Sequence, residues 1–188
     1  MKSIYISLLS ILIITTAKGQ LTKGNWLVGG NANFSSASFS NNVAATYSQT
    51  NLQISPAAGY FFIDKLAVGL RPGYVYVKTT LPGDANAYGS NTFNIGPFIR
   101  YYFLQPVNRL NIFSELSYQH SILKIKDNPS SNINGYSISA GPIVYFNQSV
   151  GIEFSIGYSN TKYAGDANTK NSTILVGIGL QVHLEKSK

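Results

Sequence analysis

Four charged residues are the first candidates for a functional site. Arg71, Arg100, Glu115 and Glu153 each fall inside a segment of alternating apolar and polar residues, on the side that carries few apolar side chains. Two positive and two negative charges on one face of a sheet can pair, and pairing is the expected remedy for charge removed from water. We therefore expect a buried, hydrogen-bonded network of these side chains, with a proton or ion path as the alternative function.

The two histidines are the other candidates for chemistry. His120 stands beside Ser121, and an enzyme that modifies lipids would use hydroxyl, imidazole and acidic groups. His183 lies near the end of the chain, and no nucleophile, base and orienting acid share a spacing that predicts a catalytic triad. The prediction is a protein without catalytic residues, cofactor or metal, with its histidines at lipid headgroups or in loops.

The segments that hold the charged residues repeat with period two, the spacing that places alternate side chains on opposite faces of a strand. In the last segment one face is apolar and the other mostly small or polar. The apolar face there consists of Ile174, Val176, Ile178, Leu180, Val182 and Leu184. No stretch indicates a long helix. The alternation predicts eight strands, at residues 25–35, 50–62, 65–78, 91–104, 109–123, 134–147, 149–161 and 171–185.

The predicted strands are long enough for a membrane. Most contain at least the roughly 9 to 11 residues that a tilted strand needs to cross a bilayer. Their connections alternate between short ones, at 63–65, 105–108 and 147–148, and long polar ones, near 36–49, 79–90, 124–133 and 162–170. Because outer-membrane barrels combine short periplasmic turns with long outer loops, both ends of the chain are predicted in the periplasm.

Aromatic residues cluster at the short-turn ends of the predicted strands. Amphipathic rings prefer the level of the lipid headgroups, where they form a girdle around a membrane protein. The predicted interfacial girdle consists of Trp26, Tyr60, Phe62, Tyr101, Phe103 and Phe146.

The first residues have the pattern of a secretory leader. Lys2 precedes an apolar run at 4–14, and Ala17-Lys18-Gly19 supplies small residues at the −3 and −1 positions of a signal-peptidase site. The run is shorter than the roughly 20 residues of a spanning helix. We therefore predict a cleaved signal peptide at 1–19 and a single barrel domain at 20–188. The sequence has no cysteine, so neither a disulfide framework nor a lipoprotein anchor is expected.

The formal net charge is +7, or +5 without Lys2 and Lys18 of the predicted leader, which is a modest basic excess typical of a solvated loop face. Lysines in or beside the polar loops are placed to face anionic glycolipid headgroups, at Lys78, Lys124, Lys126, Lys162 and Lys170. Outer-membrane lipids are the expected partners. Nucleic acid is not, because no basic cluster is interleaved with aromatics. The loop sequence Gly-Asp-Ala-Asn recurs at 83–86 and 165–168, which is ordinary turn chemistry with too few carboxylates for calcium.

Three predicted strands contain a proline before their aromatic end, namely Pro56, Pro97 and Pro142. Proline has no N–H to donate and is normally confined to sheet edges or bulges, whereas a closed barrel has no edge. At each of these points we expect a local bulge or a carbonyl without its usual donor.

Two related segments resemble a known family. Gly96-Pro97-Phe98-Ile99-Arg100-Tyr101-Tyr102-Phe103, its echo Gly141-Pro142-Ile143-Val144-Tyr145-Phe146, and the mature start at Gln20 are similar to the porin-family outer-membrane β-barrel domain proteins of Gram-negative bacteria. The resemblance spans essentially the whole mature chain. It implies an all-β, eight-stranded antiparallel up-and-down transmembrane β-barrel in the cell outer membrane, inserted by the outer-membrane assembly machinery. The chain departs from the frequent aromatic last residue by ending Leu184-Glu185-Lys186-Ser187-Lys188.

The expected function is a structural or surface-interaction barrel without an open pore, because side chains fill a barrel of eight strands. Two alternatives remain besides the enzyme. Gly24-Asn25-Trp26 superficially resembles the lipocalin motif, and a soluble lipocalin-like barrel would turn the apolar face inward around a ligand. An adhesin would use the same scaffold to display its outer loops.

Overall fold

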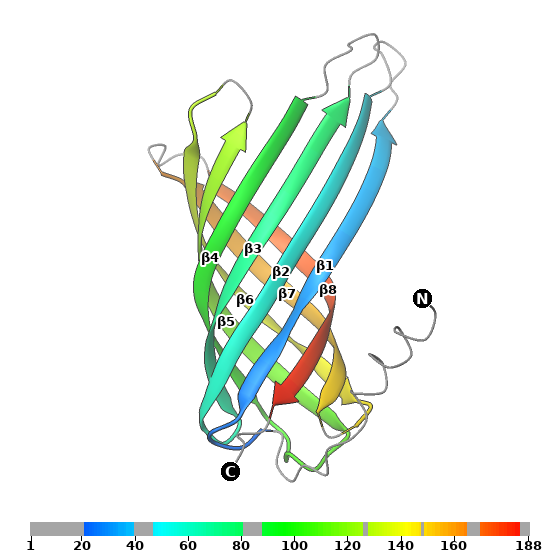
Figure 1. The fold of residues 1–188 in the computed structure, drawn as a ribbon, viewed down its shortest axis with the longest axis vertical. Helices are drawn as coiled ribbons and strands as arrows, with labels where there is room; N and C mark the ends of the chain where they lie inside the picture. Colours follow the sequence, from blue (N-terminus) through cyan, green and yellow to red (C-terminus); the bar gives the residue numbers. More distant parts are fainter. Residues whose placement is uncertain are drawn as a thin grey trace, which may run out of the picture.

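Eight antiparallel strands form a closed barrel in which each strand pairs with its sequence neighbours and β1 pairs with β8 (Figure 1). The computed structural model describes residues 21–39, 47–80, 88–125, 128–147, 149–164 and 170–184. The strands are β1 Trp26–Phe39, β2 Tyr47–Ile63, β3 Leu66–Thr80, β4 Tyr88–Tyr102, β5 Leu110–Ile125, β6 Ser131–Tyr145, β7 Val150–Tyr163 and β8 Lys170–Leu184. The predicted eight-stranded meander is confirmed.

Several strands extend further toward the long connections than predicted. β2 begins at Tyr47 instead of residue 50, and β4 begins at Tyr88 instead of residue 91. These extensions are polar, so the apolar alternation gave no sign of them, but backbone pairing continues, as between Ser48 and Thr80. The leader, the two Gly-Asp-Ala-Asn segments, Lys126 and residues 185–188 lie outside the described residues.

The two faces of the wall separate by polarity. The outward face is apolar and exposed along every strand, for example at Val28, Ile54, Leu70, Ile95, Leu116, Ile138, Ile156 and Val176. The inward face holds Arg100 and Glu115, which are 3% and 4% exposed. A lipocalin-like barrel would have the reverse arrangement, so that alternative is wrong. Trp26, on which it depended, is half exposed on the outer wall.

Pro56, Pro97 and Pro142 each lie where one ladder is interrupted without a change of register. Ile54 faces Tyr74 and Ala58 faces Leu70, so equal numbers of residues separate these pairs on β2 and β3, with Pro56 between them. The pairing of β4 with β5 skips Gly96 and Pro97, and that of β6 with β7 skips Gly141 and Pro142. Of the two predicted outcomes, a bulge is not found at these prolines, and a carbonyl without its usual donor is the one that fits. The missing donor is accommodated by local loss of pairing.

The glycine before two of these prolines lets the neighbouring strand approach closely. A Cβ at Gly96 would overlap the carbonyl oxygen of Tyr118, and a Cβ at Gly141 would overlap that of Phe154. Both oxygens belong to strands whose pairing is interrupted at that point. The Gly-Pro pairs thus keep adjacent backbones close where a hydrogen bond is absent.

We expect Gly96→Ala to lower the free energy of unfolding by about 1 to 3 kcal/mol, as overpacking against rigid backbone does. Gly89→Ala on the same strand is the matched control, because its Cβ would lie 3.7 Å from the nearest atom, in the ring of Tyr76. Urea unfolding of the barrel refolded in lipid vesicles measures the difference. Equal midpoints for the two variants would contradict this account of the Gly-Pro pairs.

Candidate functional site in the barrel lumen

The four charged residues meet inside the barrel, although they come from four different strands. Arg71 on β3 donates to Glu115 on β5 through both terminal nitrogens, at 2.6 and 2.9 Å. Arg100 on β4 donates from Nε to the same carboxylate at 2.8 Å, and from Nη1 to Glu153 on β7 at 2.7 Å. Glu115 therefore bridges both arginines, and Arg100 links both glutamates.

Neutral groups complete this charge network. The side-chain amide of Gln181 donates to Glu153, and the Tyr102 hydroxyl donates to the Gln181 oxygen at 2.8 Å. The Arg100 guanidinium carbon lies 4.2 Å from the centre of the Phe113 ring, within cation–π distance. Positive and negative charges balance within the network, as burial in low dielectric requires.

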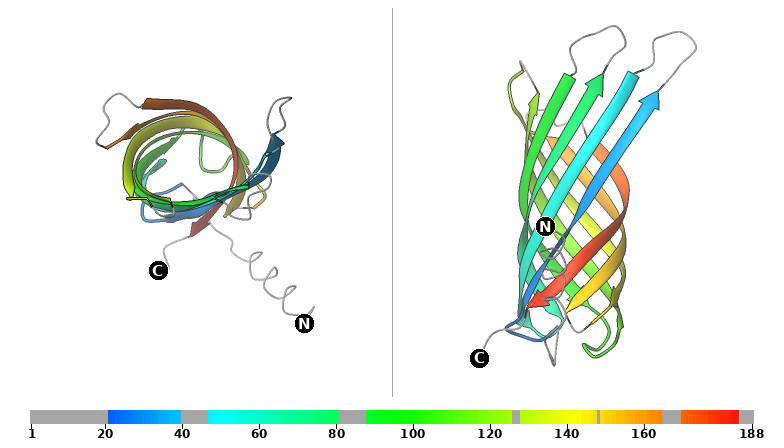
Figure 2. Two further views of the ribbon diagram at one scale, coloured as in Figure 1. Left: turned by 90° about the horizontal axis from the view of Figure 1, so that it is seen from above. Right: turned by 45° about the vertical axis from the view of Figure 1, so that its right-hand side comes forward.

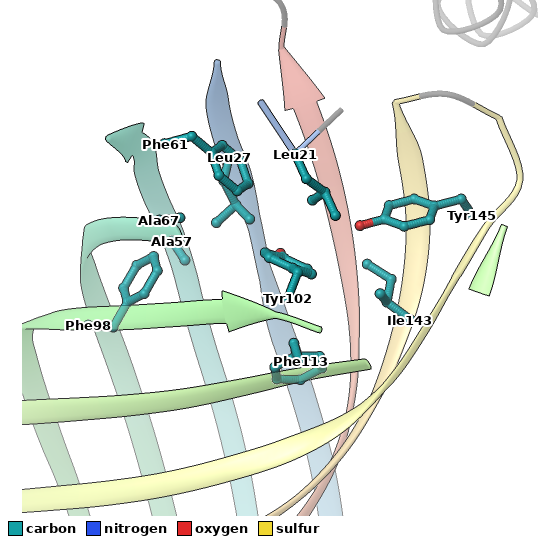
Figure 3. Packing of buried hydrophobic residues seen from close by; sticks show 10 residues of the cluster. All are labelled: Leu21, Leu27, Ala57, Phe61, Ala67, Phe98, Tyr102, Phe113, Ile143 and Tyr145. Atoms are coloured by element: carbon teal, nitrogen blue, oxygen red, sulfur yellow. The ribbon is translucent and has the colours of Figure 1, made fainter. Parts of the chain in front are cut away.

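An apolar plug packs in the lumen beside the charge network, toward the short-turn end, and Figure 3 shows its residues. It consists of Leu21, Leu27, Ala57, Phe61, Ala67, Phe98, Tyr102, Phe113, Ile143 and Tyr145. Leu21 reaches this position because the chain before β1 crosses the mouth of the barrel. Its carbonyl accepts a hydrogen bond from the Lys65 N–H at 2.7 Å, and the Gly24 N–H donates to the Phe61 carbonyl at 2.9 Å.

His183 packs against this plug. It is 2% exposed and stacks on Phe61 with ring centres 5.6 Å apart, so its expected place at headgroups or in a loop is wrong. His120 lies on the outer wall, where its Nδ1 is 2.7 Å from the Asn134 side-chain oxygen. The two histidines thus occupy opposite faces of the wall and opposite ends of their strands, and the structure does not bring them together.

A cavity of about 590 Å³ lies next to the charge network, on the side toward the long connections. Arg71, Arg100, Glu115 and Glu153 all contribute to its walls. Its other luminal residues are mostly uncharged polar or small, including Asn31, Asn33, Gln53, Ser137, Ser139 and Ser155. The lumen is therefore filled near the short turns and hollow above them.

Two aromatic bands surround the barrel. The predicted girdle residues lie at the short-turn end, where Trp26 contacts Tyr60 and Tyr101 contacts Phe103 edge to face, with ring centres 5.3 and 5.2 Å apart. The sequence reasoning missed a second band toward the long connections, formed by Phe34, Tyr74, Phe93, Tyr118, Tyr136 and Tyr158. The eight positions from Trp26 to Phe34 span about 20 Å on a tilted strand, close to the apolar height of about 25 Å of such barrels.

No helix among the described residues has the length and hydropathy to cross a membrane. Within the same part of the chain, no three His, Cys, Asp or Glu side chains are grouped so as to hold a metal ion.

Closure of the sheet, the apolar exterior between two aromatic bands and the charge network enclosed in the lumen define a small outer-membrane-type β-barrel. Residues 6–185 match the family model of the outer membrane protein beta-barrel domain. The chain belongs to this family. A comparison with curated proteins found no match.

Two solved structures are similar in fold. The crystal structure of Neisserial surface protein A (NspA) has a TM-score of 0.52 and 17% identity, over 85% of this chain and 97% of that one. The outer membrane protein OprG from Pseudomonas aeruginosa has a TM-score of 0.53 and 13% identity, over 90% of this chain and 100% of that one. At these identities the likeness concerns the fold alone.

We expect Glu115→Gln to lower the free energy of unfolding by about 3 to 5 kcal/mol, because it leaves buried guanidinium groups without their shared carboxylate. Arg71→Gln should cost less, since the Arg71 side chain is 23% exposed whereas that of Glu115 is 3% exposed. Urea unfolding in vesicles measures both.

Ser117→Ala is the control for this comparison. It removes a neutral hydrogen bond of 2.7 Å to Ser137 in the same lumen, which should cost about 1 kcal/mol. A loss in Glu115→Gln no larger than that in Ser117→Ala would mean that the charge network contributes no more than an ordinary polar contact.

Proposed function

We propose that this outer-membrane barrel is a structural or surface-interaction protein with a closed lumen and no catalytic role. The observation that carries the proposal is the filling of the lumen near the short turns. The charge network and the apolar plug pack against one another in the lumen, and Phe61, Tyr102 and Phe113 have side chains that are fully buried. An ion would have to displace several packed rings and a set of ion pairs to pass.

The proposed orientation has the short turns and both chain ends in the periplasm and the polar connections outside the cell. Exposed lysines near the far ends of four strands support it, at Lys78, Lys124, Lys162 and Lys170. Positive charge at this level is suited to the anionic headgroups of outer-leaflet glycolipids. We further propose that the outer-membrane assembly machinery inserts the chain.

The closed lumen predicts very low conductance in planar bilayers, with no channel steps at protein amounts that give steps with an open porin. Arg100→Leu should reduce stability without raising conductance, because the plug of rings remains. Gel electrophoresis before and after boiling identifies the folded barrel in each sample. Stable channel steps in the wild type, or altered conductance with unchanged stability in Arg100→Leu, would contradict the closed lumen.

The orientation is tested by cysteine labelling, since the sequence has no cysteine of its own. Lys170→Cys lies at the proposed outer end of β8, and Val107→Cys lies in the turn between β4 and β5, where Val107 is 87% exposed. A membrane-impermeant maleimide added to intact cells should label only Lys170→Cys, and both after the outer membrane is permeabilised. Labelling of Val107→Cys alone in intact cells would reverse the orientation.

A further inference from the structure

The joint that closes the barrel is paired over only part of its length. β1 pairs with β2 through fourteen residues, from Trp26 to Phe39, but with β8 through five, from Trp26 to Gly30. On the other side, β8 pairs with β7 up to Lys170. Residues 31–39 of β1 and 170–179 of β8 are thus strands with one neighbour each.

These two unpaired edges form a seam in the wall. Continuing the register of Gly30 with Leu180 would bring Ala32 opposite Ile178 and Phe34 opposite Val176. Figure 2 shows β1 and β8 side by side near the short turns and diverging above them. The seam is therefore an opening between two strands of matching register.

The luminal cavity extends into this seam. Besides its luminal lining it is bounded by Ala32 and Phe34 from β1 and by Val176 and Ile178 from β8, all of which belong to the outward-facing set. Asn31 and Asn33, on the inward face of β1, are exposed there as well. The cavity thus reaches from the charge network to the strand edges that border the seam.

The seam opens into lipid. On β1 it begins at residue 31, after Gly30, and reaches the second aromatic band at Phe34. The seam therefore lies in the half of the apolar outer surface that is farther from the short turns. With the orientation proposed above, this half faces the outer leaflet. Ile174, Val176 and Phe34 beside the opening are 73%, 81% and 69% exposed, so acyl chains are the natural neighbours of the seam.

The lining of the cavity suits a ligand whose head is polar but uncharged. Asparagine, glutamine and serine side chains line the cavity, and the four charges at its floor already pair among themselves. Gly177 on the wall leaves room, since a Cβ there would meet only the Ser155 hydroxyl, at 3.0 Å. A volume of about 590 Å³ falls within the range of ligand pockets, roughly 300 to 1,000 Å³.

We propose that the seam and cavity bind a single-chain amphiphile with an uncharged, hydrogen-bonding head, of the monoacylglycerol type, which enters sideways from the outer leaflet. The head lies among Asn31, Asn33 and Ser155 above the charge network, and the chain passes out between β1 and β8. The placement in the outer leaflet rests on the orientation proposed above.

Backbone chemistry favours such a ligand. Unpaired N–H and C=O groups are not tolerated in hydrocarbon but are tolerated where they line a wet or polar cavity. A head with hydroxyl groups, together with the water it brings, satisfies the edges at 31–34 and 176–179. An added peptide strand would also satisfy them, but it would lie in the wall and leave the cavity below it, down to Arg71 and Glu115, unfilled.

The experiment uses a monoacylglycerol with a photoreactive diazirine near its head, added to the refolded barrel in phosphatidylcholine vesicles. Mass spectrometry then locates the labelled residues. Labelling is expected on the inward-facing Ser139 and Ser155, at least fivefold above that given by a phosphatidylcholine with the same diazirine. Label confined to outward residues such as Phe34, or equal labelling by both lipids, would overturn the proposal.

Closing the seam should abolish the luminal label. Ala32→Cys with Ile178→Cys, oxidised to a disulfide, holds the edges together, whereas Val28→Cys with Val182→Cys joins residues that already pair. Luminal labelling should fall at least fivefold in the first variant and stay unchanged in the second. Gly177→Phe, which fills the cavity without a cross-link, should give the same loss. Full labelling in these closed or filled barrels would overturn the proposal.

Two further measurements distinguish failure of the ligand site from failure of the fold or of the proposed orientation. Disulfide-linked dimers formed through Ala32→Cys alone would indicate that a second copy occupies the seam, and would overturn the amphiphile proposal. The electrophoretic shift on boiling and the maleimide labelling of Lys170→Cys report folding and orientation independently. A barrel that passes both and shows no luminal label refutes the ligand site while leaving the proposed function intact.

Discussion

Backbone hydrogen bonding in the absence of water is the constraint from which the rest of this structure follows. A strand in lipid must find its donors and acceptors on neighbouring strands, so the sheet has to close on itself. Closure assigns one set of alternating side chains to lipid and encloses the other. The enclosed set includes two arginines and two glutamates, and their pairing across four strands follows from the absence of bulk water around them.

The lumen is uneven along its axis because the enclosed residues differ in size. Near the short turns the inward positions hold large rings, and the chain leading into β1 adds Leu21 to them. Farther up, the inward positions of β1, β7 and β8 become asparagine, serine and glycine, which cannot fill the same cross-section. The small inward side chains lie on the same side of the barrel as the unpaired segments of β1 and β8. The same eight strands therefore enclose a packed lumen near the short turns and a hollow lumen, bordered by the seam, toward the long connections.

Much of the fold could be predicted from the sequence because period two is a local property that survives without knowledge of partners. The strand number, the outward apolar set and the inward charges at Arg100 and Glu115 all depend on that alternation. Strand ends could not be located, because polar extensions such as 47–49 pair through backbone alone. The burial of His183 depends on Phe61 and Tyr145, which are distant in sequence, and the seam depends on register between the first and last strands. The alternation places His183 on the inward face, but neither its packing partners nor the seam leaves a local signal.

The position of the single tryptophan has a consequence for how assembly can be followed. Trp26 begins β1 and is flanked by Tyr60 on β2 and Leu184 on β8, the last described residue of the chain. Hairpins between sequence neighbours close short loops, whereas joining β1 to β8 closes a loop of nearly the whole domain and is entropically the most expensive step. The indole lies at that final contact. Because Trp26 contacts Tyr60 on β2 and pairs with Leu184 on β8, its emission reports both the first hairpin and ring closure, without any label being introduced.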